Sequence, residues 1–187
     1  MLASLAIPAG ALALIVTHTS HPGRTPPSSA TPTTDAPTDA TKARTGTGAP
    51  DFTLKSTRGA LVTLSALRGH PVVIAFFASW CHPCEEELPV LQQFARDDGR
   101  LRVLGINFQD LAADTATFVD RLRVTFPALL EDPTGPVAQR YGIRGIPQTV
   151  FVDRHGIVRG RVYGETSHQA LAPAIADLLA GRNIRPI

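Results

Sequence analysis

The stretch PVVIAFFASWCHPCEEELP, residues 71–89, contains both cysteines of this 187-residue chain. Residues 71–79 form a short, continuous apolar run rich in β-branched and aromatic side chains, as is typical of a strand buried on both faces. Acids and then apolar residues at helical spacing follow, which predicts a helix over residues 85–98. Cys81 is therefore expected at or just before the amino terminus of a helix that follows a buried strand.

The two cysteines are expected to perform thiol chemistry because of this position. Thiol exchange proceeds through the thiolate, and a free cysteine thiol has a pKa of about 8.5. The unpaired N–H groups and partial positive charge of a helix amino terminus stabilise such an anion at Cys81. Cys84 comes one helical turn later, so it is expected to be the buried thiol that resolves a mixed disulfide. Pro83 suits the first turn, where its missing N–H would have no intrahelical partner.

A structural disulfide, a metal site and a haem attachment site are the other roles that a cysteine pair can have. A structural disulfide would close a loop too small to add much stability, and it stays an alternative. A metal site needs further ligands, and no second CxxC or closely spaced histidine pair completes one. Attachment of c-type haem requires histidine directly after the second cysteine, where Glu85 stands, so that role is excluded. His82 is expected either to favour the Cys81 thiolate or to be a tolerated loop residue.

The remaining apolar patterns predict an α/β domain with a mixed sheet and helices on both faces. Alternation around an Arg-Gly turn predicts a β-hairpin over residues 52–67. A strand, a helix, a short helix, two strands around a turn and a last helix are expected at residues 101–108, 115–124, 135–142, 149–153, 156–164 and 168–181. Open sheets of this kind generally carry their sites at the carboxyl ends of central strands, which is where the cysteines are expected.

The composition predicts one globular domain preceded by a leader and a linker. The chain is 43% hydrophobic with a net charge of +2, which gives no reason to expect nucleic acid as a partner. Residues 1–17 are expected to be a signal peptide or membrane anchor, although the apolar run is shorter than the roughly 17 to 25 residues of a spanning helix. A frayed apolar terminus or a core helix is the alternative. Residues 18–48, rich in Pro, Thr and Ser, are predicted to be a flexible linker, and residues 49–187 the folded domain.

The motifs FFASWCHPC at residues 76–84 and GIRGIPQTVFVD at residues 142–153, with Pro89 in the helix between them, resemble the thioredoxin superfamily. The closer resemblance is to its membrane-tethered extracytoplasmic branch, the TlpA, ResA and CcmG (DsbE) proteins. The resemblance implies a thioredoxin-like fold over residues 49–181. It also implies an added amino-terminal hairpin and an insertion at residues 110–133 before a cis-proline.

The resemblance also implies roles for individual residues. Cys81 would be the nucleophile and Cys84 the resolving thiol of a redox-active disulfide. The Ile146–Pro147 peptide bond would be cis and would face the active site, since X-Pro bonds tolerate the cis form far better than others. Trp80 is expected either to cover the disulfide and form a shallow client-docking surface with Ile146 and Pro147, or only to pack against its neighbours.

Proton transfer at the buried thiol is assigned by the same resemblance. Cytosolic thioredoxins carry a buried Asp six residues before the first cysteine, and that position is Ala75 here. In ResA-like proteins a Glu three residues after the second cysteine takes this task, and the matching residue is Glu87. Residues three apart share a helical face, so Glu87 is expected to handle the proton of Cys84. His82 and Pro83 complete the residues expected to contact the client.

Together these features predict an extracytoplasmic thiol–disulfide oxidoreductase that uses no cofactor or metal. The expected partners are client proteins with thiols or disulfides and a membrane-bound or secreted redox donor or acceptor. The domain is expected to be monomeric and tethered through its amino-terminal segment. ResA-like and CcmG-like proteins act as reductants in cytochrome c assembly, whereas some similar secreted proteins oxidise their clients, so the direction of electron flow stays open. The alternatives are a redoxin-type peroxidase, which usually has Thr where Ala78 stands, and a non-catalytic binding module.

Overall fold

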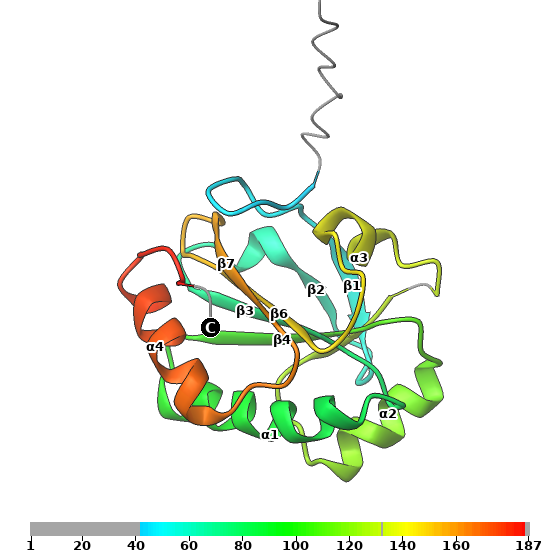
Figure 1. The fold of residues 1–187 in the computed structure, drawn as a ribbon. Coiled ribbons are helices and arrows are strands. Elements are labelled where there is room, and N and C mark those ends of the chain that lie inside the picture. Colours follow the sequence, from blue (N-terminus) through cyan, green and yellow to red (C-terminus); the bar gives the residue numbers. More distant parts are fainter. Residues whose placement is uncertain (1–41, 132, 186–187) are drawn as a thin grey trace, which may run out of the picture. The chain divides into compact units, whose positions relative to one another are not determined.

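The computed structural model describes residues 42–131 and 133–185 (Figure 1). Within these residues, seven strands form one mixed sheet in the order β2-β1-β5-β4-β3-β6-β7. The strands are β1 Thr53–Ser56, β2 Leu61–Thr63, β3 Val72–Phe77, β4 Arg102–Asn107, β5 Ala128–Leu130, β6 Gln148–Val152 and β7 Val158–Tyr163. The helices are α1 His82–Asp97, α2 Ala112–Arg121, α3 Pro136–Tyr141 and α4 His168–Leu179, with a short 3-10 helix at Leu64–Leu67. The predicted mixed sheet with flanking helices is confirmed.

Strand β3 lies in the middle of the sheet and delivers the chain to the cysteines. All six of its residues are buried, as its unbroken apolar sequence predicts. It pairs in parallel with β4 and antiparallel with β6, which places Ala75 between Gly105 and Thr149. Gly105 is required there because a Cβ atom at this position would stand 2.8 Å from the Phe77 ring. The end of β3 is therefore fixed by neighbours on both sides.

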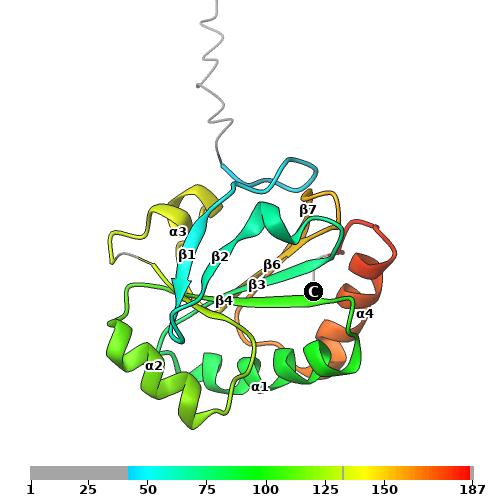
Figure 2. The same ribbon diagram turned by 180° about the vertical axis from the view of Figure 1, so that it is seen from behind.

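Two hydrophobic cores cover the two faces of the sheet. One lies under α1, α2 and α4 and includes both cysteines. The other lies under α3 and the 3-10 helix. Figures 1 and 2 show the three longer helices on one side of the sheet and α3 on the other. Side chains on each strand alternate between these two cores, so neighbouring residues of β6 act on opposite faces.

Two elements of the inserted segment differ from the sequence prediction. Strand β5 was not predicted, because three residues after a proline carry no periodic signal of their own. Its formation depends on pairing with β4 and with β1, which lies more than 70 residues earlier in the chain. Helix α2 begins at Ala112 rather than at residue 115 and ends at Arg121, and Arg123 has a φ of 53°. The backbone has left the helix there, so the apolar periodicity beyond Arg121 is not helical.

The last residues of the predicted linker contact the folded domain. The backbone N–H of Ala43 donates to Arg140, and Gly46 and Thr47 exchange backbone hydrogen bonds with Val158 at 2.8 and 2.9 Å. Residues 42–48 therefore lie against α3 and the beginning of β7. The predicted leader, residues 1–17, and residues 18–41 of the predicted linker lie outside the described residues. Within the described ranges, no helix has the length and apolar character needed to cross a membrane.

Candidate active site

The two cysteines lie at the amino terminus of α1 and are joined in a disulfide. Cys81 is the N-cap residue with an extended backbone, and its Sγ accepts a hydrogen bond from the backbone N–H of Cys84 at 3.3 Å. The predicted position at a helix start is confirmed. The residue is 4% exposed, whereas Cys84 is fully buried. Cys81 is thus the slightly more exposed of the two cysteines, and the helix terminus favours negative charge at its sulfur.

The rim of this site is formed by exposed residues around the helix start. Trp80 is 60% exposed, and its indole Nε1 donates to the carbonyl oxygen of Gln109 at 3.4 Å. The His82 side chain is also exposed and lies 3.8 Å from Glu85, measured from Nδ1 to Oε2. Pro83 occupies the first helical turn, as its missing N–H allows. Their roles in client contact stay predictions.

The Ile146–Pro147 peptide bond is cis, as the resemblance implied. It immediately precedes β6, and the Pro147 carbonyl accepts a hydrogen bond from the N–H of Gly164 at 2.9 Å. Ile146 packs against both hydrophobic cores, including the one that contains the cysteines. The cis-proline segment thus joins the face that carries the disulfide to the opposite face of the sheet.

Glu87 is a buried carboxylate with only part of its hydrogen-bonding capacity used. It is 1% exposed, and its Oε1 accepts hydrogen bonds from the hydroxyls of Thr149 at 3.1 Å and Thr166 at 2.6 Å. Its Oε2 has no hydrogen-bond partner among the described residues. Burial raises the pKa of Glu87, and the two threonine hydrogen bonds oppose this rise. Such a carboxyl group is suited to exchange a proton with a thiol.

Glu87 lies near Ala75, the β3 position that holds a buried Asp in cytosolic thioredoxins. Thr149 lies directly opposite Ala75 in the ladder between β6 and β3. Through its bond to Thr149, the Glu87 carboxylate reaches the sheet beside Ala75. Cys84 is three residues before Glu87 on the same buried face of α1. Helix α1 therefore supplies a buried acid close to the strand position where cytosolic thioredoxins carry theirs.

Comparison with known proteins agrees with this geometry. Residues 45–161 match the AhpC/TSA family. The chain belongs to the AhpC/TSA family. It is 33% identical over 122 residues to the thiol:disulfide interchange protein CycY of Rhizobium leguminosarum, an alignment that covers 63% of this chain and 65% of CycY. The chain thus spans slightly less than two thirds of that relative.

Other relatives of this AhpC/TSA family member carry related names. It is 30% identical over 129 residues to the thiol-disulfide oxidoreductase ResA of Geobacillus thermodenitrificans, covering 68% of this chain and 74% of ResA. A secreted Mycobacterium tuberculosis disulfide oxidoreductase homologous to E. coli DsbE has a TM-score of 0.62 and 28% identity, covering 68% of this chain and 96% of that one. The predicted thioredoxin-like fold and the thiol–disulfide oxidoreductase class are confirmed.

Sequence reasoning missed one carboxylate that holds the site of this AhpC/TSA family member in place. Asp110 is 7% exposed and follows β4. It accepts hydrogen bonds from the backbone N–H and hydroxyl of Ser79, at 2.7 and 2.9 Å, and from the N–H of Leu111 and the hydroxyl of Thr115, at 3.0 and 2.9 Å. It thereby ties the loop before Cys81 to the start of α2. An Asp between a strand and a helix was the available signal.

Replacing Asp110 with alanine is expected to destabilise the domain by about 2 kcal/mol, because several buried or half-buried donors lose a charged acceptor. Urea denaturation of the oxidised protein measures this change. The matched control is Asp114→Ala, which removes an exposed acid from the same helix start and should change stability by less than about 0.5 kcal/mol. Equal midpoints for the two variants would contradict the tying role of Asp110.

Proposed function

We propose that this protein is an extracytoplasmic thiol–disulfide oxidoreductase that exchanges disulfides with client proteins through Cys81 and Cys84. The observation that carries the proposal is the disulfide at the start of α1, with the N–H of Cys84 directed at the Cys81 sulfur. A helix start stabilises the Cys81 thiolate and not a thiolate buried deeper in the helix. The two sulfurs are therefore unequal, as stepwise exchange requires.

The exchange proceeds in two steps that conserve atoms and electrons. A client thiolate attacks Sγ of Cys81, the bond between Cys81 and Cys84 breaks, and Cys84 leaves as a thiolate. A second client thiolate then attacks the mixed disulfide on the client sulfur, so the client gains a disulfide and Cys81 leaves as a thiolate. The client is oxidised and the protein is reduced by two electrons. Reduction of a client disulfide is the reverse sequence.

Glu87 is proposed to handle the proton of Cys84. A fully buried thiolate is disfavoured by desolvation, so Cys84 needs a nearby group to accept its proton when it attacks a mixed disulfide. Glu87 lies on the same helical face, and its raised pKa brings its ionisation closer to neutral pH. The client is proposed to lie across Trp80, Ile146 and Pro147, with the exposed edge of α1 beside it. His82 and Pro83 form that edge.

The compartment and tether are also proposals. One solved relative is described as secreted, and disulfides form and persist mainly outside the reducing cytosol. Residues 1–17 would serve as leader or anchor and residues 18–48 as linker, although residues 42–48 lie against the domain. We propose a monomeric domain that draws electrons from, or passes them to, a membrane-bound or secreted partner. A reductant role in cytochrome c maturation and an oxidant role toward secreted clients differ only in the potential of the disulfide.

Equilibration of the domain with glutathione redox buffers tests the function and its direction. The fraction of alkylatable thiol should follow a two-electron transition within the range from about −270 mV for thioredoxin to about −120 mV for DsbA. A value near the lower end indicates a reductant and one near the upper end an oxidant. Cys81→Ser is the control, because it cannot form the disulfide. Absence of exchange with the uncharged bis(2-hydroxyethyl) disulfide would contradict the proposed function.

A redoxin-type peroxidase is the second candidate because it shares this fold and the family match covers the site. Ala78 is fully buried in the same core as the cysteines and offers no hydroxyl where such peroxidases usually have Thr. Peroxide consumption is therefore expected to be much slower than disulfide exchange. The opposite order of rates, measured with hydrogen peroxide, would favour the peroxidase.

A further inference from the structure

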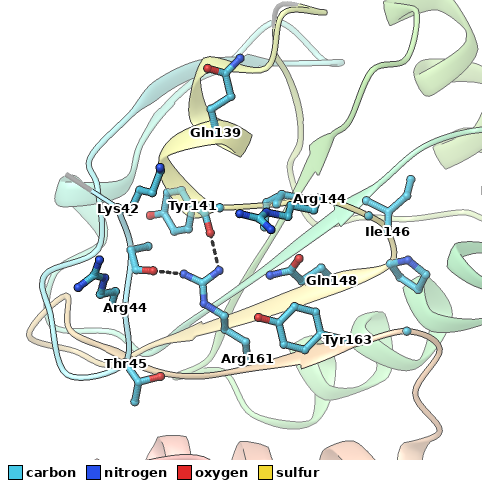
Figure 3. Close-up of a pocket in the computed structure, with 16 residues that line it drawn as sticks. Lys42, Arg44, Thr45, Gln139, Tyr141, Arg144, Ile146, Gln148, Arg161 and Tyr163 are labelled. Carbon is cyan, nitrogen blue, oxygen red and sulfur yellow. Dashed lines mark hydrogen bonds between the residues drawn. The ribbon is translucent and has the colours of Figure 1, made fainter. Parts of the chain in front are cut away.

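A large pocket lies on the face of the sheet opposite α1, next to the cis-proline (Figure 3). Its volume is about 1070 Å³, slightly above the roughly 300–1,000 Å³ typical of small-molecule sites. Three segments line it, residues 42–45, 139–148 and 161–164, and we call it the cis-proline pocket. Ile146 and Pro147 are part of this lining, and Ile146 also packs against the core that contains the cysteines. The pocket is therefore continuous with the proposed client-docking surface.

The charge of the cis-proline pocket is one-sided. Its described lining includes Arg44, Arg144 and Arg161 and no acidic residue. The guanidinium of Arg161 donates hydrogen bonds to two backbone carbonyls, those of Ala43 and Tyr141, which hold the side chain without neutralising its charge (Figure 3). An anion in this pocket would therefore meet several positive charges and no repelling carboxylate from the lining.

Gln148 gives an independent reason to expect that a ligand of this pocket carries a hydrogen-bond acceptor. The residue is 1% exposed, and its Nε2 has no hydrogen-bond partner among the described residues. It is the first residue of β6, and its side chain lines the cis-proline pocket, as Figure 3 shows. The next residue, Thr149, faces the other way and binds Glu87. A buried amide group without an acceptor is costly, so a ligand that brings an acceptor gains binding energy there.

The start of α1 and the residue that follows pocket-lining Gly164 carry the opposite charge. Glu86 lies in the first turns of α1, and Glu165 is close enough to Glu86 for a hydrogen bond between them to raise the pKa of Glu165, whereas Glu85 is paired with Arg121. An acidic segment is repelled by Glu86 and Glu165 and attracted to the arginines of the cis-proline pocket. The two charged regions thus favour one orientation of a client across the disulfide.

We propose that the cis-proline pocket binds an acidic segment of the client protein, whose carboxylates accept a hydrogen bond from Gln148 and pair with Arg144. Arg144 is available for this role, because it is exposed and makes no hydrogen bond or ion pair with another described residue. The pocket is large enough for several residues of an extended chain. This inference rests on the proposed function and adds the client feature that the enzyme recognises.

Single-cysteine peptides of matched sequence test the proposal. One acidic peptide carries aspartates before the cysteine, and a second carries them after it. Each acidic peptide is compared with a neutral peptide in which asparagines replace the aspartates. The reduced full-length protein should reduce the disulfide dimer of one acidic peptide about three to ten times faster than its asparagine counterpart at low salt. The preference should disappear in about 1 M salt, where charges are screened within about 3 Å.

Variants locate the effect. Arg144→Gln and Gln148→Ala should each lower the ratio of acidic to neutral peptide rates toward one. Arg96→Gln removes an exposed arginine at the far end of α1 and should keep the wild-type ratio. If Gln148→Ala does not fold, Arg144→Gln decides alone, because the Arg144 side chain is exposed and makes no hydrogen bond or ion pair with another described residue.

A second substrate separates failure of this inference from failure of the proposed function. If the wild type exchanges with bis(2-hydroxyethyl) disulfide but reduces neither acidic peptide faster than its counterpart, the pocket assignment is wrong and the oxidoreductase stands. If it exchanges with no disulfide, the proposed function fails as well. An acidic preference that Arg144→Gln and Gln148→Ala both retain would place recognition elsewhere and overturn the inference.

Discussion

Replacing Cys84 with serine is expected to lower disulfide turnover by about a thousandfold, because a hydroxyl cannot replace a thiol in resolving a mixed disulfide. The remaining Cys81 thiol keeps its place as the N-cap of α1 and still attacks client disulfides. With no sulfur beneath it, the covalent intermediate persists. The variant should therefore accumulate as a mixed disulfide between Cys81 and the client.

Mass spectrometry after incubation with an oxidised peptide measures this accumulation directly. The control is Cys81→Ser, which retains a fully buried thiol that client disulfides cannot readily reach. It should form at most a small amount of mixed disulfide. If Cys81→Ser traps the peptide and Cys84→Ser does not, the two sulfurs have the opposite roles and the proposed order of steps is wrong.

The placement of the two sulfurs could be predicted because its determinants are local. The apolar run over residues 71–79, a proline in the first turn and a following helical pattern are all contained in one short stretch. The structure places Cys81 at the N-cap accordingly. Strand β5 could not be predicted in this way, because three residues become a strand only through their distant partners.

The surroundings of the site depend on contacts that periodicity does not encode. Glu87 binds Thr149 and Thr166, which are 62 and 79 residues away along the chain. The acid itself was predicted from the resemblance and its helical spacing, but its threonine partners were not. Gln148 could not be singled out either, because the pairing of β6 with its neighbours decides on which side of the sheet each of its side chains lies. Sequence therefore predicts the reactive atoms better than the groups that tune them.

Replacing Glu87 with glutamine is expected to slow resolution of the mixed disulfide by about a hundredfold near neutral pH, as loss of a general base generally does. In the proposed mechanism, Cys84 passes its proton to the Glu87 carboxylate and then attacks the Cys81 sulfur. The carboxylate must be ionised to accept that proton. Burial raises its pKa, so the wild-type rate should increase with pH as Glu87 loses its proton and becomes able to act as a base.

The pH profile distinguishes this role from a structural one. In Glu87→Gln, the rise in rate should move to higher pH, because the buried thiol must then ionise without a base. Thr166→Val should move the profile in the same direction by a smaller amount. The Thr166 hydroxyl lowers the pKa of Glu87, so its removal raises that pKa while leaving the base in place. Stopped-flow release of a peptide thiol from a preformed mixed disulfide gives the rate at each pH.

The matched control is Glu86→Gln, which removes an exposed acid from the adjacent position of α1. Its rate should stay within about twofold of the wild type, since exposed charges have small effects in water. If Glu86→Gln and Glu87→Gln give the same pH profile, the change in rate comes from the overall charge at the start of α1 and not from a base at Glu87. An unchanged profile in Glu87→Gln would mean that Cys84 loses its proton to another acceptor, because the buried carboxyl would then have no part in the transfer.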